Sequence, residues 1–100
     1  MGLCLAMPTA DGSERVFRLT PGRTVLGSDS RCGLRVSLPQ VAPYHCALVT
    51  DNGKVRVEDL DSETGTFHNG SRITAATLAP DDRLTIGPVT FVVRLDDASG

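Results

Sequence analysis

Hydrophobic and polar residues alternate along this chain in short segments that are separated by turn residues. Polar and apolar side chains alternate over residues 15–19, after Asp11-Gly12, and residues 23–27 follow Pro21-Gly22. Alternation over about five residues is typical of a half-buried strand, because successive side chains of a strand point to opposite faces of the sheet. The pattern predicts strands at residues 3–7, 15–19, 23–27, 34–37, 46–50, 55–58, 66–68, 72–74, 83–87 and 89–95.

Two Asn-Gly pairs predict tight hairpins. Asn52-Gly53 lies between the segments 46–50 and 55–58, and Asn69-Gly70 lies between 66–68 and 72–74. Asn and Gly accept the positive φ angles that a two-residue hairpin turn needs. Residues 75–78 have a composition that favours a helix, but one turn is too short to be stable as an isolated helix. We therefore expect no helix.

Strands of this length and spacing are typical of an all-β sandwich, so we expect about 10–11 strands in two antiparallel or mixed sheets. The chain has no Trp and only four other aromatic residues, so aliphatic side chains must fill most of the core. The residues on the inward phase of the segments are Phe17, Leu19, Leu26, Leu34, Val36, Cys46, Leu48, Val55, Val57, Phe67, Ile73, Leu84, Ile86, Phe91 and Val93. We expect one domain over residues 1–95, followed at 96–100 by the start of a polar linker or tail.

Composition and charge narrow the class of partner. The net charge of −2 supplies no basic field for nucleic acid or for an anionic membrane surface. The apolar run at residues 3–7 is too short to span a bilayer, so we expect a cytoplasmic domain without direct membrane insertion. Three cysteines without a Cys-x-x-Cys pair indicate reduced, mostly buried thiols. No catalytic, metal-binding or nucleotide-binding motif is present, so we expect neither an enzyme nor a cofactor or metal.

The amino-acid sequence of the loops resembles that of a known family. The landmark segments are Val-Leu-Gly-Ser at 25–28, Cys-Gly-Leu-Arg-Val at 32–36, 41–48, 57–70, Leu-Ala-Pro-Asp-Asp at 78–82, and Leu-Thr-Ile-Gly-Pro at 84–88. In order and spacing these resemble the landmarks of forkhead-associated (FHA) domains, and the match extends from about residue 17 to residue 95. The resemblance implies an FHA-like (SMAD/FHA) sandwich of eleven strands, whose loops at one end bind phosphothreonine peptides through an arginine.

The family's phosphate-binding positions are altered in this chain. Its glycine is present as Gly27, but the arginine that should follow and pair with the phosphate is Ser28. In the family's Ser-x-x-His motif the histidine that braces the loop is retained as His45. The serine that bonds the phosphate is replaced by Ala42, which has no side-chain donor.

A third position, which should hold the main chain of the peptide, is also changed. The asparagine of the family's Asn-Gly-Thr motif is Thr64, before Gly65, and a hydroxyl cannot reproduce the two-way contact of an amide. Loss of all three groups implies binding weaker by on the order of a thousandfold. The loops also contain Asp29, Asp61 and Glu63 against one cation, Arg31, so a dianion would meet an acidic rim.

A second resemblance agrees with this expectation. Leu-Gly-Ser-Asp at 26–29, and Val41-Ala42-Pro43 before His45, are similar to the FHA-like cytoplasmic domain of the inner-membrane ring protein of type III secretion systems. That family keeps the sandwich without the phosphate-binding set and uses it as an assembly part. Because the residues after the last predicted strand are small and polar, we expect a domain of a longer multidomain chain.

We therefore expect a noncatalytic protein-protein interaction module that binds a protein or peptide partner without requiring a phosphate. The expected contact loops are 28–33, 42–44 and 61–66, with Tyr44 either as an aromatic anchor or merely packed against its loop. Candidate contact residues are Ser28, Ser30, Arg31, Ala42, Tyr44, Glu63, Thr64 and Asn69, and the structural landmarks are Gly27, His45, Gly65 and Gly70. Two alternatives stay open: a phosphothreonine-peptide reader that uses Arg31 for the missing arginine, and an architectural or self-associating domain.

Overall fold

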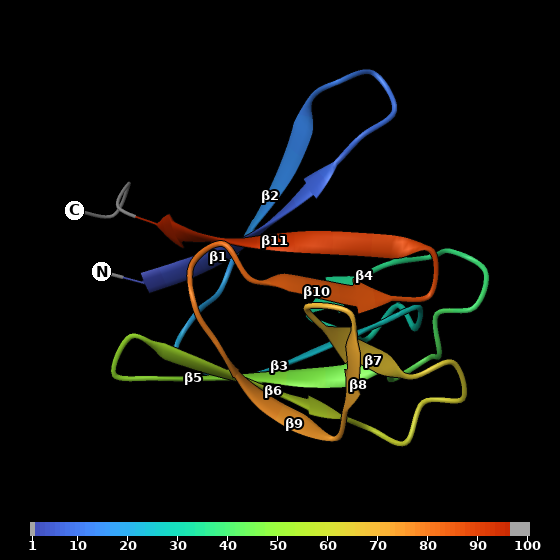
Figure 1. The fold of residues 1–100 in the computed structure, drawn as a ribbon. Coiled ribbons are helices and arrows are strands. Elements are labelled where there is room, and N and C mark those ends of the chain that lie inside the picture. Colours follow the sequence, from blue (N-terminus) through green and yellow to red (C-terminus); the bar gives the residue numbers. More distant parts are fainter. Residues whose placement is uncertain (1, 97–100) are drawn as a thin grey trace.

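The strands pack as two facing sheets in the computed structural model, which describes residues 2–96 (Figure 1). No helix occurs in this described part of the chain, so the prediction of an all-β sandwich is confirmed. Its strands are β1 (Gly2–Pro8), β2 (Glu14–Arg18), β3 (Gly22–Gly27), β4 (Leu34–Arg35), β5 (Cys46–Asp51), β6 (Lys54–Asp59), β7 (Thr66–His68), β8 (Ser71–Ile73), β9 (Ala75–Leu78), β10 (Arg83–Ile86) and β11 (Val89–Asp96).

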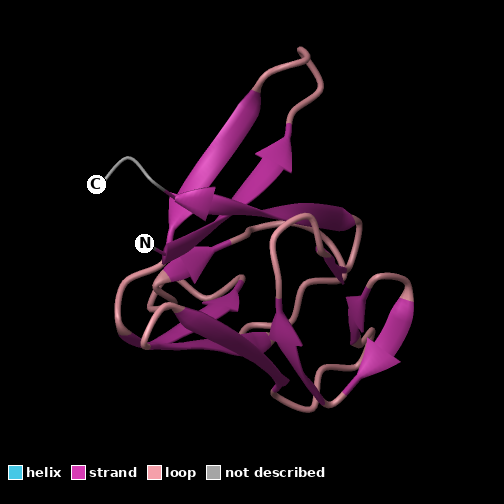
Figure 2. Cartoon of the chain, turned by 60° about the vertical axis from the view of Figure 1, so that its left-hand side comes forward, coloured by secondary structure: helices cyan, strands magenta, loops and turns pink. Residues whose placement is uncertain are grey.

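The two sheets have six and five strands. The first has the order β2-β1-β11-β10-β7-β8, and the second has the order β4-β3-β5-β6-β9. Neighbouring strands are antiparallel except β3 and β4, which pair in parallel through Leu26↔Leu34 and Gly27↔Arg35. The β1–β2 hairpin projects away from the body of the sandwich (Figures 1 and 2). It leaves β2 as a free edge of the larger sheet.

The predicted Asn-Gly hairpins are confirmed by their backbone angles. Asn52 and Gly53 have φ of 53° and 76°, and Asn69 and Gly70 have φ of 51° and 87°. These turns connect β5 to β6 and β7 to β8. Both central residues of each turn lie in the left-handed region, which Asn and Gly enter at low cost.

The sequence pattern did not predict strand β9, and it overestimated the length of strand β4. Residues 75–78, which resemble a helical turn in composition, form β9 and pair with β6 from Glu58↔Ala75 to Val55↔Leu78. Alanine has little preference for strands, but the free edge of β6 offers backbone partners that outweigh local propensity. The predicted strand at 34–37 is limited to Leu34–Arg35.

The core lies between the two sheets and is mostly aliphatic, as expected. Leu26, Leu48, Leu84, Ile86 and Phe91 are fully or almost fully buried. The predicted core residues Phe17, Leu19, Phe67 and Ile73 are only half-buried, because they lie on or beside the edge strands β2 and β8. Five further residues are buried although they were not among the predicted core residues, and these are Leu3, Leu5, Val41, Leu78 and Val89.

The ends of the described chain lie side by side. Gly2 of β1 pairs with Asp96 of β11, so the first and last strands are neighbours in the interior of the larger sheet. Asp96, where the polar tail was expected to begin, is the last residue of β11, and residues 97–100 of that predicted tail lie outside the described residues. Within the described residues there is no helix long and apolar enough to cross a membrane.

Candidate functional site

Three connecting loops meet at one end of the sandwich, where the sequence predicted the partner site. We call this the loop end, and it consists of residues 28–33 after β3, 40–44 before β5, and 61–65 after β6. Backbone groups join the first two loops: the Ser28 amide donates to the Ala42 carbonyl at 3.0 Å, and the Asp29 amide donates to the Pro43 carbonyl at 3.2 Å. The Thr64 hydroxyl joins the third loop to the second by donating to the Gln40 carbonyl at 2.8 Å.

Gly27 is required by the close approach of the first two loops. A Cβ atom on Gly27 would lie 2.2 Å from the carbonyl oxygen of Pro43 and 3.0 Å from that of Ala42. Both atoms belong to the backbone, so neither can rotate away as the end of a flexible side chain would. The glycine landmark therefore reflects a steric requirement of the loop end.

His45 connects the second and third loops from below. Its ring is fully buried, and its Nδ1 accepts a hydrogen bond from the Ala42 amide at 3.1 Å. Because Nδ1 is an acceptor, Nε2 carries the proton and donates to the Gly65 carbonyl at 2.8 Å. The imidazole is thus a neutral brace between two loops, which is the structural role that the resemblance implied.

A half-buried carboxylate holds the start of the third loop. Asp59 accepts hydrogen bonds from the amide and hydroxyl of Ser62 and, at 2.7 Å, from the Thr66 hydroxyl. Burial alone would raise the pKa of Asp59, but these bonds from Ser62 and Thr66 outweigh it and lower the pKa below its usual value. Asp59 is therefore ionised at neutral pH, and it fixes the loop from which Glu63 and Thr64 project.

Arg31, the cation of the first loop, is already paired. Its Nε and NH2 groups donate to the two carboxylate oxygens of Asp29 at 3.0 Å and 3.1 Å, and its amide donates to the same carboxylate at 2.8 Å. The bonds from Arg31 lower the pKa of Asp29 to about 2, so this pair is ionised on both sides at neutral pH. The charge of Arg31 is therefore largely compensated within its own loop.

Tyr44 lies against this ion pair. The guanidinium carbon of Arg31 is 5.7 Å from the centroid of the Tyr44 ring, a distance typical of a cation–π contact. The tyrosine is nevertheless 41% exposed. Tyr44 of the second loop thus packs against Arg31 of the first loop with one part of the ring and presents the rest to solvent.

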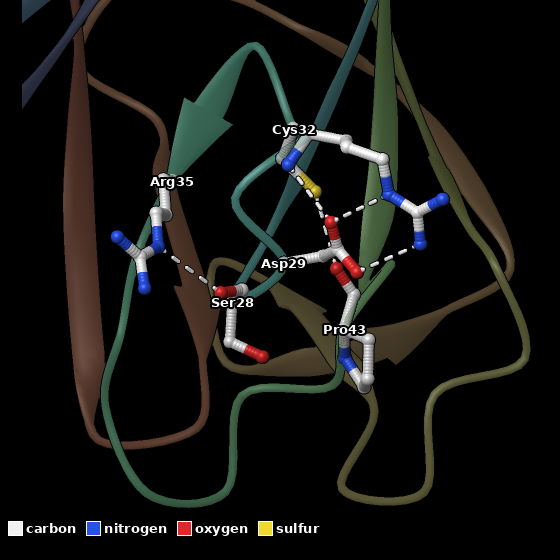
Figure 3. A network of polar contacts seen from close by, with 6 residues as sticks. Ser28, Asp29, Cys32, Arg35 and Pro43 are labelled. Carbon is white, nitrogen blue, oxygen red and sulfur yellow. Dashed lines mark hydrogen bonds and ion pairs between the residues drawn. The ribbon is translucent and has the colours of Figure 1, made fainter.

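Two arginines that the sequence reasoning did not count reach the loop end from strands. Arg35 of β4 donates from Nε to the Ser28 carbonyl at 3.3 Å (Figure 3). The side chain of Arg72 in β8 lies over Gly65, where Nε is 2.7 Å from the position that a Cβ atom would occupy. Arg35 follows the first loop by only two residues, whereas the pairing of β7 with β8 brings Arg72 back over the third loop.

The remaining predicted residues divide into two groups. Ser28, Ser30, Ala42, Glu63 and Thr64 all lie at the loop end, and Gly65, with φ of 89°, lets the third loop turn into β7. Asn69 and Gly70 lie at the other end of β7 and are not brought together with the loops. Asn69 instead binds the Asp82 carboxylate at 3.2 Å and accepts from the Arg83 amide at 2.8 Å. It stabilises the β7–β8 turn against β10.

A shallow hollow of about 210 Å³ lies between the second and third loops. Its lining residues are Gln40, Val41, Ala42, Pro43, Glu63 and Thr64. The lining has one carboxylate and no cationic side chain, and its only hydroxyl is bonded to Gln40. The hollow suits an uncharged or cationic group better than a phosphate dianion.

Comparisons with known proteins agree with this architecture. A family model described as the inner membrane component of T3SS, cytoplasmic domain, matches residues 11–97. The chain belongs to this family. It therefore has an FHA-like fold, and both resemblances seen in the sequence are confirmed.

Solved FHA domains superpose on most of the chain. The FHA domain of FhaA, complexed with the intracellular domain of Rv3910, is 26% identical with a TM-score of 0.86 and covers 93% of this chain and 100% of that chain. The FHA domain of the CT664 protein from Chlamydia trachomatis has a TM-score of 0.88 at 21% identity, covering 96% of this chain and 99% of that one. The second comparison bears on the fold alone.

Two curated relatives come from Mycobacterium tuberculosis. The FHA domain-containing protein FhaA is 26% identical over 94 residues, which are 94% of this chain and 18% of that protein. The ABC transporter ATP-binding/permease protein Rv1747 is 32% identical over 74 residues, which are 74% of this chain and 9% of that protein. The chain thus spans less than a fifth of the length of either relative.

Proposed function

We propose that this FHA-like domain is a noncatalytic protein-interaction module whose loop end docks a partner chain without requiring a phosphate. The observation that carries the proposal is the pairing of Arg31 with Asp29 through two side-chain bonds. A phosphate that engages Arg31 would either displace Asp29 or share the guanidinium with it, and in both cases the Asp29 carboxylate would remain as a negative charge beside the dianion. A cation that is already paired gains little free energy from a second anion.

The other two altered positions support the same function. Ala42 has no donor for a phosphate oxygen, and the Thr64 hydroxyl is committed to Gln40. A charge-assisted bond contributes roughly 1.5–3 kcal/mol and a neutral bond about 1 kcal/mol, so their combined absence weakens phosphopeptide binding by on the order of a thousandfold. What the loop end offers instead is the exposed part of Tyr44 and the hollow beside Pro43. Aromatic anchors of this kind are common at the centres of protein interfaces.

Phosphothreonine binding is the second candidate function, and Arg35 and Arg72 favour it. Both guanidinium groups flank the loop end, and neither forms an ion pair with a carboxylate within residues 2–96. A solved relative with 25% identity was studied for phosphothreonine-dependent FHA domain interactions. In this candidate Arg35 would supply the cation that Ser28 lacks, a role that the sequence had suggested for Arg31.

A restoration experiment separates the two functions. The isotope-labelled domain and the triple variant Ser28→Arg, Ala42→Ser, Thr64→Asn are each titrated with a phosphothreonine peptide library and with its unphosphorylated counterpart, and amide shifts are recorded. We expect no preference for phosphate in the natural chain and a gain on the order of a thousandfold in the restored variant. Micromolar binding by the natural chain that disappears after phosphatase treatment would overturn the proposal.

The docking surface itself is tested with unphosphorylated peptides selected by phage display. We expect the enriched peptides to shift amides of residues 28–33, 42–44 and 61–66, and Tyr44→Ala to weaken their binding. Lys54→Ala is the matched control, because Lys54 lies in the β5–β6 hairpin and belongs to none of the three loops. Equal losses in both variants, or shifts confined to other strands, would count against the loop end as the docking site.

A further inference from the structure

A groove separate from the loop end lies on the open side of the sandwich. It is bounded by edge strand β2 of the larger sheet and by residues 35–38, which comprise the end of β4 and the segment after it, and its volume is about 330 Å³. Apolar side chains form its floor, and these are Met7, Phe17, Val36 and Leu38. An adjoining hollow shares Met7 and Leu38 and continues along Pro8 and Val89, so the apolar surface extends beyond the groove.

The groove follows a free strand edge. Strand β2 is the last strand of its sheet and pairs with β1 from Cys4↔Arg18 to Pro8↔Glu14. Its far edge therefore offers backbone donors and acceptors to an incoming strand. The usual protections of such an edge are charged side chains, above all lysine, and proline; β2 has no lysine or proline, although three of its five residues are charged. Val16, at the centre of β2, is 55% exposed.

The rim of the groove is positively charged. Arg15 and Arg35 line it from opposite sides, and within residues 2–96 neither forms an ion pair with a carboxylate. Arg15 lies over the Phe17 ring at 5.3 Å, and Arg35 uses one donor on the Ser28 carbonyl. The nearby Glu14 does not neutralise Arg15, because it projects from the opposite face of β2 and binds Arg94 at 2.6 Å.

We infer that this groove is a second docking site, which binds an extended acidic segment of a partner protein as an added strand on β2. Strand addition would give the backbone bonds, and every second side chain of the segment would face the groove. An apolar residue would contact Phe17 and Leu38, and acidic residues two positions before and after it would approach the two arginines. Charge complementarity between the rim and the segment would determine which partners bind.

The experiment uses a fluorescein-labelled probe peptide, Thr-Glu-Thr-Leu-Thr-Glu-Thr, with the full 100-residue chain. We expect saturable anisotropy changes, together with amide shifts in β2 and in residues 35–38. Two matched probes test the two parts of the mechanism. One replaces both glutamates by lysines, and the other carries methyl groups on two adjacent backbone nitrogens, one for each edge of the strand. Both are expected to bind at least about tenfold more weakly.

Charge reversal on the protein tests the rim. The variant Arg15→Glu, Arg35→Glu should lose about tenfold or more in affinity, and the loss should shrink as salt is added. The control Arg23→Glu, Arg56→Glu changes the net charge equally on other strands and should bind as the natural chain does. Both arginines of the rim are exposed, so the variant should remain folded. Its amide spectrum should therefore resemble that of the natural chain.

Three results would overturn the inference. If the lysine probe bound as tightly as the glutamate probe, charge would play no role in binding. If the methylated probe bound as tightly, the peptide would not bind by strand addition. Shifts of β2 that grow with protein concentration in the absence of a probe, with a dimer mass by light scattering, would assign the edge to a second copy of the chain instead of an acidic partner.

Discussion

Replacement of His45 by alanine would test how the loop end is held together. The imidazole is fully buried and makes two hydrogen bonds, one from the Ala42 amide and one to the Gly65 carbonyl. His45→Ala would leave both backbone groups without this partner, the Gly65 carbonyl in a buried position and the Ala42 amide in a half-buried one, and would open a cavity where the ring was. We therefore expect a large loss of stability and a loosening of the second and third loops.

The magnitude follows from these two effects. An unsatisfied buried polar group costs about 1–3 kcal/mol, and two groups lose their partner, although water that enters the cavity would recover part of this cost. Removal of a buried ring adds a cavity term, so the total is about 3–5 kcal/mol. A domain of this size has a free energy of unfolding of about 5–15 kcal/mol, so the variant would be folded but clearly weakened.

Urea unfolding followed by circular dichroism measures this loss, provided that the slope of the transition is unchanged. The chain's other histidine provides the control, because His68 is half-buried and bonds the Asp82 carboxylate at 2.7 Å without joining two loops. We expect about 1 kcal/mol for His68→Ala. Amide exchange of Ala42 should also accelerate in His45→Ala alone. If His45→Ala lowered the free energy of unfolding by less than about 1 kcal/mol, or if both variants lowered it equally, the role of His45 as a brace between the loops would be refuted.

Two further substitutions test the steric and electrostatic parts of the site. Gly27→Ala should cost about 3 kcal/mol or more in urea unfolding, because its Cβ would lie 2.2 Å from the Pro43 carbonyl oxygen. Gly2→Ala, which meets no atom within 4 Å, should be nearly neutral, and similar costs in both would contradict the steric argument. Asp59→Asn should cost about 1–3 kcal/mol at neutral pH. The lowered pKa of Asp59 makes its contribution fully present above its unfolded value of 3.8 and lost as pH falls through the folded value. Thus the difference in urea midpoint between Asp59→Asn and the natural chain should narrow in acid, and a constant difference at all pH values would contradict this assignment.

Much of the fold could be predicted from alternation and turn residues. The two Asn-Gly hairpins are local features, and so both were predicted with the right partners. Strand β9 was missed because its alanines carry no strand signal, and its formation depends on the edge of β6. The burial of Leu3 and Leu5 was missed because the position of β1 between β2 and β11 is a property of the whole topology.

The candidate site, too, could be predicted only where its features are local in the sequence. The three loops could be located because their landmark residues are contiguous in sequence. Arg72 could not be assigned to them, because its side chain reaches the third loop only after β7 and β8 have paired. Arg35 is only two residues past the first loop, but its bond to the Ser28 carbonyl depends on a loop conformation that the sequence does not reveal. The neutralisation of Arg31 by Asp29 also depends on a loop conformation that composition does not reveal, although both residues were recognised as charges of the rim.

The way in which the loops are joined has a consequence for how such a domain can diversify. The contacts between the first two loops run from the amides of Ser28 and Asp29 to the carbonyls of Ala42 and Pro43, and these are atoms that almost every amino acid possesses. The frame therefore depends on few side chains, chiefly the absence of one at Gly27 and the ring of His45. Other residue types can therefore replace those at positions 28 and 42 at little cost to folding. A new ligand preference can arise in this way while the fold stays the same.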